Sequence, residues 1–357
     1  MTAKKGTPET ASSPPLDARK AFILATIVYE YVASAEPVGS NTLTQKYRLG
    51  VSSATIRNEM AELEAAGYLV QPHTSAGRIP SDSGYRTYVD HLMRPEALAP
   101  EESRRIGDEL RAASRELEEA VEAATRVLGQ LSHNLAFVVE PPRDAQVFRH
   151  VQLVWLSEHS GLAIVVAPLG VVAQQSFDHE ASVGPEELAR LSNLLNARFD
   201  GKPLRELAAV ETLPIVRELA LPDALAEVVA SAFAAAAGAD LPPAVVASGT
   251  QHLLDQPEFQ DLRKLRGILR IIEEQQALYD LVADAIADSG PSAKIGRELG
   301  SEEIGECSIV TVPYRLAERG VGVLAILGPR RMPYARLFAL AAGTAASLDA
   351  HLAARQG

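Results

Sequence analysis

The stretch from Glu36 to Asp90 constrains the fold most, because capping and turn residues follow one another in it at short, regular intervals. Ser40 is a plausible N-cap for a short helix that ends near Tyr47. Gly50 then supplies a tight turn, since glycine tolerates positive φ. Ser52 or Ser53 caps a further helix, which Gly67 ends. Two short helices joined by a tight turn predict a helix-turn-helix unit.

The second of these helices has two faces of different chemistry. Apolar residues recur on one face at helical spacing and predict burial against the preceding helices; they are Ile56, Met60 and Leu63. The opposite face carries Arg57 and Asn58 among small residues. Because Arg pairs bidentately with guanine and Asn with adenine, this face is suited to the major groove of DNA. The alternative is an ordinary solvated helix face.

A predicted β-hairpin follows the helices. Tyr68–Val70 has the composition of a short strand, His73–Arg78 forms a turn with a cation at its tip, and Ile79 starts the return. Ser81 can cap a next helix. A hairpin with Gly and Arg at its tip, placed after a recognition helix, is typical of a wing that contacts phosphate or the minor groove. A surface loop in which Gly77 only makes a turn is the alternative.

The charge distribution favours the same region. The whole chain has 34 Lys/Arg, 46 Asp/Glu and a net charge of −12, but residues 1–95 hold ten basic and nine acidic residues. The first 95 residues therefore carry +1 and the remainder −13. Only the first part is electrostatically compatible with a phosphate backbone, and the acidic remainder would repel DNA.

The rest of the chain predicts a mixed α and β body. Asp17 can cap a first helix to about Ala33 after a polar tail, and Pro95 and Pro100 mark a linker. Further elements are expected as helices over 101–131, 185–238, 255–286 and from 333, and as strands over 135–140, 151–156, 162–167, 171–177, 308–314 and 320–327. Strands on both sides of a helical block suggest one α/β domain with an insertion.

Nothing in the sequence indicates an enzyme or a bound cofactor. The eight His have no metal-ligand spacing, and the single Cys307 is expected to be a small buried residue. His73 near the predicted wing could contact phosphate, although a solvated loop His is the alternative. No signal peptide or membrane span is expected, so a reducing cytoplasm is the predicted location.

Several stretches closely resemble one family of proteins. They are EPVGSNTL from Glu36, LGVSSATIRNEMAELEAAGYLVQPHTSAGRIPSDSGYRTYVD from Leu49, LLDQPEFQDLRKLRGIL from Leu253, KIGREL from Lys294 and GVGVLAILGPRRMPY from Gly320. These stretches cover about a third of the chain, keep their order and resemble the heat-inducible transcription repressor HrcA family.

The resemblance implies an α+β multidomain protein with a specific organisation. An N-terminal winged helix-turn-helix is followed by a GAF-like domain that a mainly helical dimerisation domain interrupts. The expected parts are a disordered tail over 1–16, the winged domain over 17–94, the GAF-like domain over 101–178 and 291–357, and the insert over 179–290. The resemblance further implies a homodimeric repressor of chaperone operons that binds the inverted-repeat CIRCE operator and is supported by the GroEL chaperonin.

The candidate DNA contacts all lie in the winged module. They are Ser40, Ser52, Ser53, Ala54, Thr55, Arg57, Asn58, His73, Thr74, Ser75, Gly77, Arg78 and Arg86. Arg57 and Asn58 are expected to read base edges, while Arg78 and Arg86, with Ser53 and Thr55, are expected to contact phosphate. Two alternatives remain: a repressor that senses a small molecule through its GAF-like domain, and an enzyme that carries a DNA-binding module.

Overall fold

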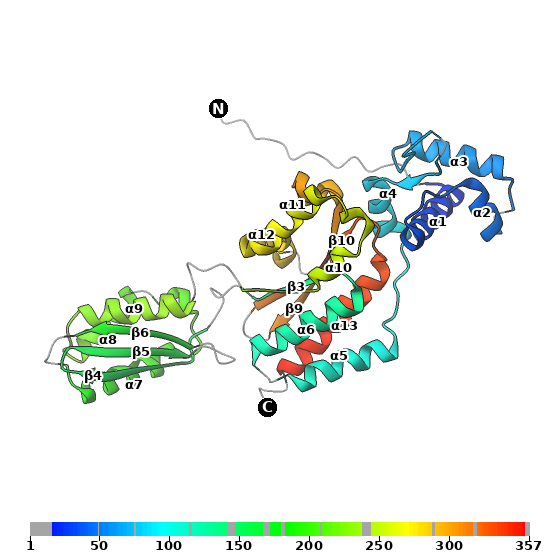
Figure 1. The fold of residues 1–357 in the computed structure, drawn as a ribbon. Helices are drawn as coiled ribbons and strands as arrows, with labels where there is room; N and C mark the ends of the chain where they lie inside the picture. The colour runs from blue at the N-terminus through cyan, green and yellow to red at the C-terminus, as the bar shows by residue number, and fades with distance from the viewer. Residues whose placement is uncertain are drawn as a thin grey trace. The chain divides into compact units, whose positions relative to one another are not determined.

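The computed structural model contains two compact units, Met1–Arg94 and Pro95–Gly357, which are described separately (Figure 1). The residues it describes are 16–48, 50–74, 76–113, 116–141, 147–166, 172–179, 183–207, 209–237, 244–287, 290–316 and 320–353. The polar tail predicted over 1–16 therefore lies almost wholly outside the described residues.

The first unit contains the short elements in the predicted order. Its elements are α1 (Ala18–Ser34), α2 (Ser40–Lys46), α3 (Ser53–Ala65), β1 (Leu69–Val70), β2 (Ile79–Pro80), α4 (Asp82–Thr87) and the π-helical turn η1 (Tyr88–Leu92). Strands β1 and β2 pair antiparallel, with Leu69 opposite Pro80 and Val70 opposite Ile79. A two-stranded hairpin thus joins α3 to α4.

Caps and a small apolar core fix these helices. Asp17 accepts backbone hydrogen bonds from Arg19 and Lys20 at the start of α1, and Ser52 accepts one from Thr55 at the start of α3, as predicted. The predicted inner face of α3 is confirmed, because Ile56, Met60 and Leu63 are all buried. Helix α3 contacts α1, α2 and β1, and Leu24, Ile27, Leu43 and Tyr85 of the same unit are buried as well.

The second unit is built on a five-stranded antiparallel sheet in the order β7-β3-β10-β9-β8. Its strands are β3 (Leu135–Val139), β7 (Val245–Ser248), β8 (Ser292–Ile295), β9 (Cys307–Leu316) and β10 (Gly320–Pro329). All five residues of β3 are buried, which is expected of a strand covered on both faces. Cys307, at the start of β9, is fully buried, as predicted.

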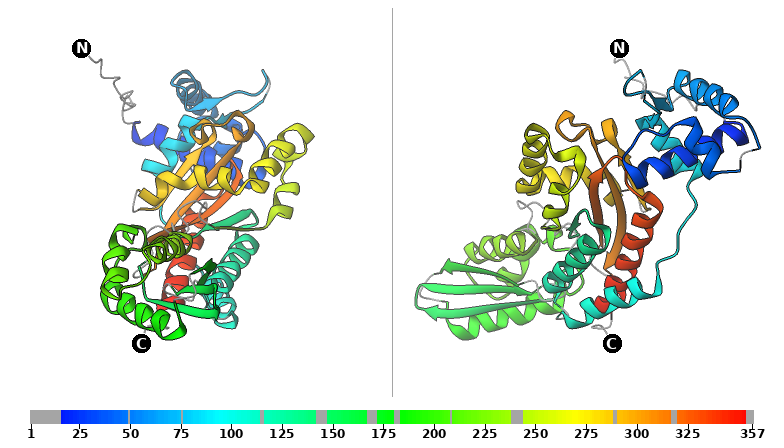
Figure 2. Two further views of the ribbon diagram at one scale, coloured as in Figure 1. Left: turned by 90° about the vertical axis from the view of Figure 1, so that its left-hand side faces the viewer. Right: turned by 45° about the vertical axis from the view of Figure 1, so that its right-hand side comes forward.

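Helices cover both faces of this sheet. Helices α5 (Pro100–Ala112), α6 (Leu117–Ser132) and α13 (Tyr334–Ala353) form one group, and α6 and α13 contact the strands. The other face packs against α10 (Thr250–Leu254), η5 (Pro257–Phe259), α11 (Leu262–Glu273) and α12 (Gln275–Ala287). The right-hand view in Figure 2 shows α13 in red and the yellow α11–α12 segment on opposite sides of the strands. The side chains of Phe137, Phe259, Ile268 and Leu278 help to fill the space under α10–α12.

A second body is inserted between two neighbouring strands of this sheet. Strands β3 and β7 pair antiparallel, and the Glu140 amide donates to the Ala244 carbonyl just beyond them, at 3.0 Å. Between these residues lies a separate antiparallel sheet, β4-β5-β6, with its own core. The elements of this body are β4 (His150–Ser157), β5 (Ser160–Val166), β6 (Val172–Asp178), α7 (Pro185–Phe199), η4 (Leu204–Glu206), α8 (Ala209–Glu218) and α9 (Ala224–Ala237). Figure 1 shows it in green.

The predicted domain boundaries in this unit are wrong in two places. The strands over 150–178 do not continue the first sheet, because their inward residues Val151, Leu153 and Phe177 belong to the core formed with α7–α9. Conversely, α11 and α12 are not part of the insert, since Ile268 and Leu278 pack under the five-stranded sheet. The inserted body therefore spans about residues 147–237 and is mixed α/β, where 179–290 and mainly helical were predicted.

Two predicted long helices are each divided. The helix expected over 101–131 is two helices, α5 and α6, that pack on each other, and Ala113 after α5 has extended backbone angles. The predicted apolar stripe is nonetheless buried: Ile106, Leu110, Leu117, Val121 and Leu128. The helix expected over 255–286 is α11 and α12, preceded by η5. Among the residues described, no helix combines the length and the apolar character needed to cross a bilayer.

Two further short helical turns are described in the second unit. The turns η6 (Gly296–Leu299) and η7 (Glu302–Ile304) connect β8 to β9. Strands β7 and β8, at the two edges of the sheet, were not predicted, because four residues are too few to show a clear alternation.

Candidate nucleic-acid interface

The outer face of α3 presents two polar side chains to solvent. Arg57 and Asn58 are both exposed, and Ala54 lies exposed one turn before Asn58. Among the residues described, the side chains of Arg57 and Asn58 form no hydrogen bond or ion pair. Their donors and acceptors are therefore available to an external partner such as a base edge. Thr55 is half-buried, because it lies between this face and the cap at Ser52.

Every carboxylate on α3 faces a cation of the same unit. Arg19 approaches Glu59 to 3.4 Å, Lys20 approaches Glu62 to 3.0 Å, and Arg78 approaches Glu64 to 2.8 Å. Asp17 also bonds Lys20, and its carboxylate, together with that of Glu62, raises the pKa of the Lys20 ammonium above its usual range. Because α1 and the hairpin neutralise the three acidic side chains, α3 does not carry an unbalanced negative charge toward a phosphate backbone.

A network of small hydroxyls joins α2 to the start of α3. The Ser40 Oγ lies 3.0 Å from the Ser53 Oγ, and the Ser53 Oγ donates to the Asn41 Oδ1 at 2.6 Å. Ser40 is buried, so its side chain orders the turn and is not at the surface. The prediction that Ser40 caps α2 is also wrong, because Gly39 occupies the cap position. Asn41 could not be identified from the sequence, since no spacing rule relates it to Ser53.

The hairpin loop differs from its prediction in where the cation lies. Arg78 is not at the tip: it immediately precedes β2, and its backbone pairs with Val38. Its guanidinium bonds Glu64, and the side chain is only 16% exposed. Among the described residues of the loop, Pro72, His73 and Thr74 are exposed. Ser75, also predicted as a contact, lies outside the described residues.

Other polar side chains form hydrogen bonds and an ion pair within the loop and the following helix. Gln71 Nε2 donates to the carbonyls of Thr74 at 3.1 Å and Ala76 at 2.9 Å, which holds the loop closed. Arg86, predicted to contact phosphate, pairs with Asp90 at 3.1 Å one turn further along. Gly77 is half-buried near Val38. The structure thus brings the α3 residues together, whereas Arg86 and Arg78 have partners within the unit.

A buried carboxylate fixes α2 against α1. Glu30 is 8% exposed and accepts from the Lys46 Nζ at 2.6 Å and from the Tyr47 hydroxyl at 2.7 Å. These hydrogen bonds lower the pKa of Glu30 from its ordinary 4.5. Burial, together with the same carboxylate, raises the pKa of Tyr47 to about 12.

Glu30→Gln is expected to loosen α2 from α1. Hydrogen bonds to charged groups contribute on the order of 2 kcal/mol, and Gln retains the shape without the charge. Because the folded state lowers the pKa of Glu30, its stabilisation is present above pH 4.5 and is lost as the pH falls through the lowered value. Hydrogen exchange of the α2 amides at pH 7 should therefore speed up in Glu30→Gln and not in Glu36→Gln, an exposed control. Equal protection of α2 in both variants would contradict this.

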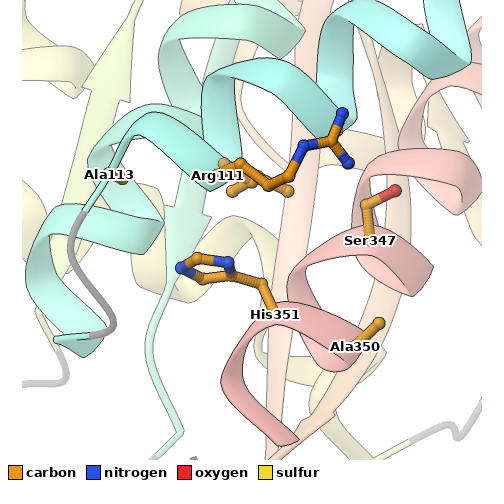
Figure 3. Close-up of a pocket in the computed structure, with 7 residues that line it drawn as sticks. Arg111, Ala113, Ser347, Ala350 and His351 are labelled. Carbon is orange, nitrogen blue, oxygen red and sulfur yellow. The ribbon is translucent and has the colours of Figure 1, made fainter. Parts of the chain in front are cut away.

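The second unit contains a pocket of about 400 Å³ between α5 and α13 (Figure 3). The residues that line it are Gly107, Leu110, Arg111, Ala113, Ser347, Ala350 and His351. Arg111 pairs with Asp108 at 2.5 Å, and the Ser347 hydroxyl donates to the Gly343 carbonyl at 2.8 Å. The proton of the Ser347 hydroxyl is thus directed into its own helix.

Comparison with known proteins is consistent with this arrangement. The family model described as the HrcA protein C-terminal domain matches residues 118–338. The heat-inducible transcription repressor HrcA of Pelotomaculum thermopropionicum is 38% identical over 322 residues, which cover 90% of this chain and 92% of that protein. The protein of the same name from Symbiobacterium thermophilum is 37% identical and covers 94% and 98%. The crystal structure of a hypothetical protein, 22% identical, has the same fold with a TM-score of 0.60 over 95% of this chain and 99% of that one. The chain belongs to the heat-inducible transcription repressor HrcA family.

Proposed function

We propose that this chain is a transcription repressor of heat-inducible genes that reads DNA with α3. The exposed and unpartnered Arg57 and Asn58, on a helix whose carboxylates are neutralised, are the observation that carries the proposal. In the major groove Arg57 would pair with the O6 and N7 of guanine and Asn58 with the N6 and N7 of adenine. Ala54 and the methyl group of Thr55 are suited to thymine methyl groups.

The first unit would act as a winged helix-turn-helix. Helices α2 and α3 form the helix-turn-helix, and the hairpin β1–β2 forms the wing, whose exposed His73 and Thr74 can contact phosphate. The N-terminus of α3, with Ser52 and Ser53, offers further donors to phosphate oxygens. Repression would follow because a protein bound over a promoter excludes the polymerase.

A homodimer would place two such units on an inverted repeat of the CIRCE type. The inserted body supports this, since its described helices α7–α9 pack on the face of the sheet that carries Val151, Leu153 and Phe177. The other face presents half-buried Val154, Leu162, Ile164 and Val166, none of which belongs to the core of the body, and Leu156 at its end is 54% exposed. An isologous contact between two such apolar faces would join two chains. Their two DNA-binding units would then lie about one helical turn of DNA, or a multiple of it, apart.

The operator itself provides the test. Purified full-length protein should bind the inverted repeat from the promoter of its own chaperone operon at least about 10³-fold more tightly than a shuffled duplex of the same composition. Fluorescence anisotropy at a fixed salt concentration measures both affinities. Equal affinities would contradict sequence-specific repression.

Release on heating is expected to depend on the chaperonin. A GroEL-type chaperonin would refold heat-unfolded repressor to the state that binds DNA. An excess of other unfolded proteins would occupy the chaperonin, so the repressor would stay unfolded and repression would be relieved. After a heat cycle, operator binding should recover when chaperonin and ATP are present and should stay low without them. Full recovery in both samples would contradict this part of the proposal.

A further inference from the structure

The ion pair between Arg78 and Glu64 connects the hairpin to the reading helix α3. We propose that Arg78 is a positioning residue that sets the hairpin against α3, and that it does not contact phosphate itself. This inference rests on the proposed function, because it concerns the site that would read the operator. It also assigns a role to Glu64, which sequence reasoning did not single out.

Backbone hydrogen bonds fix the hairpin to the segment that precedes α2. Arg78 and Val38 exchange two hydrogen bonds, each 2.9 Å, so the chain entering β2 pairs with the segment that leads into α2. A Cβ on Gly77 would lie 2.4 Å from the carbonyl carbon and oxygen of Val38. Only glycine therefore allows this close approach, and Gly77 serves the junction between the hairpin and α2.

The side chain of Arg78 is fixed by an ion pair with Glu64. Its Nε donates to the Glu64 Oε2 at 2.8 Å, and the two side chains are only 16% and 33% exposed. Glu64 lies in the last turn of α3, at the end opposite Ser52. Because the pair is largely shielded from water, it should contribute more than an exposed pair would. The guanidinium is thus hydrogen-bonded to the C-terminal end of α3. The exposed residues His73 and Thr74 of the hairpin loop can still contact DNA.

A positioning role for Glu64 and simple electrostatic repulsion predict opposite changes in DNA affinity when Glu64 is neutralised. Neutralising a carboxylate near DNA should tighten binding, because it removes repulsion from phosphate. If Glu64 positions the hairpin through Arg78, neutralising Glu64 should instead weaken binding. Glu62 provides the matched control, since it is another carboxylate of α3 and its ion pair, at 3.0 Å, is with Lys20 of α1 and not with Arg78.

The experiment compares Glu64→Gln, Arg78→Gln, the double variant and Glu62→Gln in the full-length protein. Operator affinity is measured at several salt concentrations. Glu64→Gln and Arg78→Gln should each weaken binding on the order of tenfold, and the double variant should be no weaker than either, because both remove the same interaction. The salt slope should stay unchanged in all of them, and Glu62→Gln should bind as tightly as the unmodified protein or more tightly.

Hydrogen exchange without DNA gives an independent readout. Amides of residues 69–80 should exchange faster in Glu64→Gln and in Arg78→Gln, while those of α1 and α3 keep their protection, which also shows that the variants are folded. The proposal is overturned if Arg78→Gln lowers the salt slope by about one, as loss of a phosphate contact would. It is equally overturned if Glu64→Gln tightens operator binding as Glu62→Gln does, or if exchange over 69–80 is unchanged. If the unmodified protein binds the operator no more tightly than random DNA, the proposed function is refuted. The hydrogen-exchange comparison would still test whether the Arg78–Glu64 ion pair positions the hairpin.

Discussion

Ile164→Asp is expected to separate the proposed dimer and to weaken operator binding by about 10²- to 10⁴-fold, the gain that joining two binding modules provides. Ile164 lies on β5 in the middle of the open sheet face, opposite Gln152 of β4 and Gln174 of β6. A carboxylate there would have to be desolvated for two copies to meet, while in the separate chain it would remain in water. The fold of the inserted body should be kept, because Ile164 is outside its core.

Val210→Asp is the control for this prediction. Val210 is an apolar residue of the same body, on α8, with 72% exposure, so the substitution adds the same charge elsewhere on the surface. Light scattering should give a dimer for the unmodified protein and for Val210→Asp, and a monomer for Ile164→Asp. If Ile164→Asp remains a dimer with full operator affinity, the open sheet face is not the contact between copies.

Arg57→Ala is expected to cost about 1–3 kcal/mol on the operator and to relax the requirement for one base pair in each half-site. The bidentate contact to guanine is lost, while phosphate contacts elsewhere in the unit are kept. Binding to random DNA should therefore change little. Substituting each operator position in turn identifies the base pair that Arg57 reads.

Arg48→Ala provides the comparison, because Arg48 is an exposed Arg of the same unit outside α3. Its loss should affect operator and random DNA to the same extent. If Arg57→Ala instead lowers both affinities equally, Arg57 contacts the backbone and does not read sequence.

The local features of the first unit could be predicted from the sequence because they depend on neighbours within a turn or two. The caps at Asp17, Ser52 and Ser81, the inner face of α3 and the β1–β2 hairpin follow from residue type and spacing. The partner of Arg78 could not be predicted. Its position just after a glycine suggested a turn tip, whereas pairing with Val38, far back in the chain, places it at the base of the hairpin.

The organisation of the second unit depended on long-range pairing, which periodicity does not reveal. Strands β4–β6 belong to a separate body because they pair with one another and not with the larger sheet. The break between α5 and α6 was also hidden, because the apolar stripe keeps its spacing from Ile106 to Leu128 across it. No Gly or Pro marks that break in residues 113–116.

A footprint of the purified protein on the promoter of its own chaperone operon tests directly whether a dimer reads DNA through α3. We expect two protected blocks within an inverted repeat, with centres about one helical turn or a multiple of it apart. Both blocks should become accessible again after heating without chaperonin. Both blocks should weaken together in Ile164→Asp and in Arg57→Ala. A promoter without protection, or a single protected block that both variants leave intact, would contradict a dimeric repressor that reads DNA through α3.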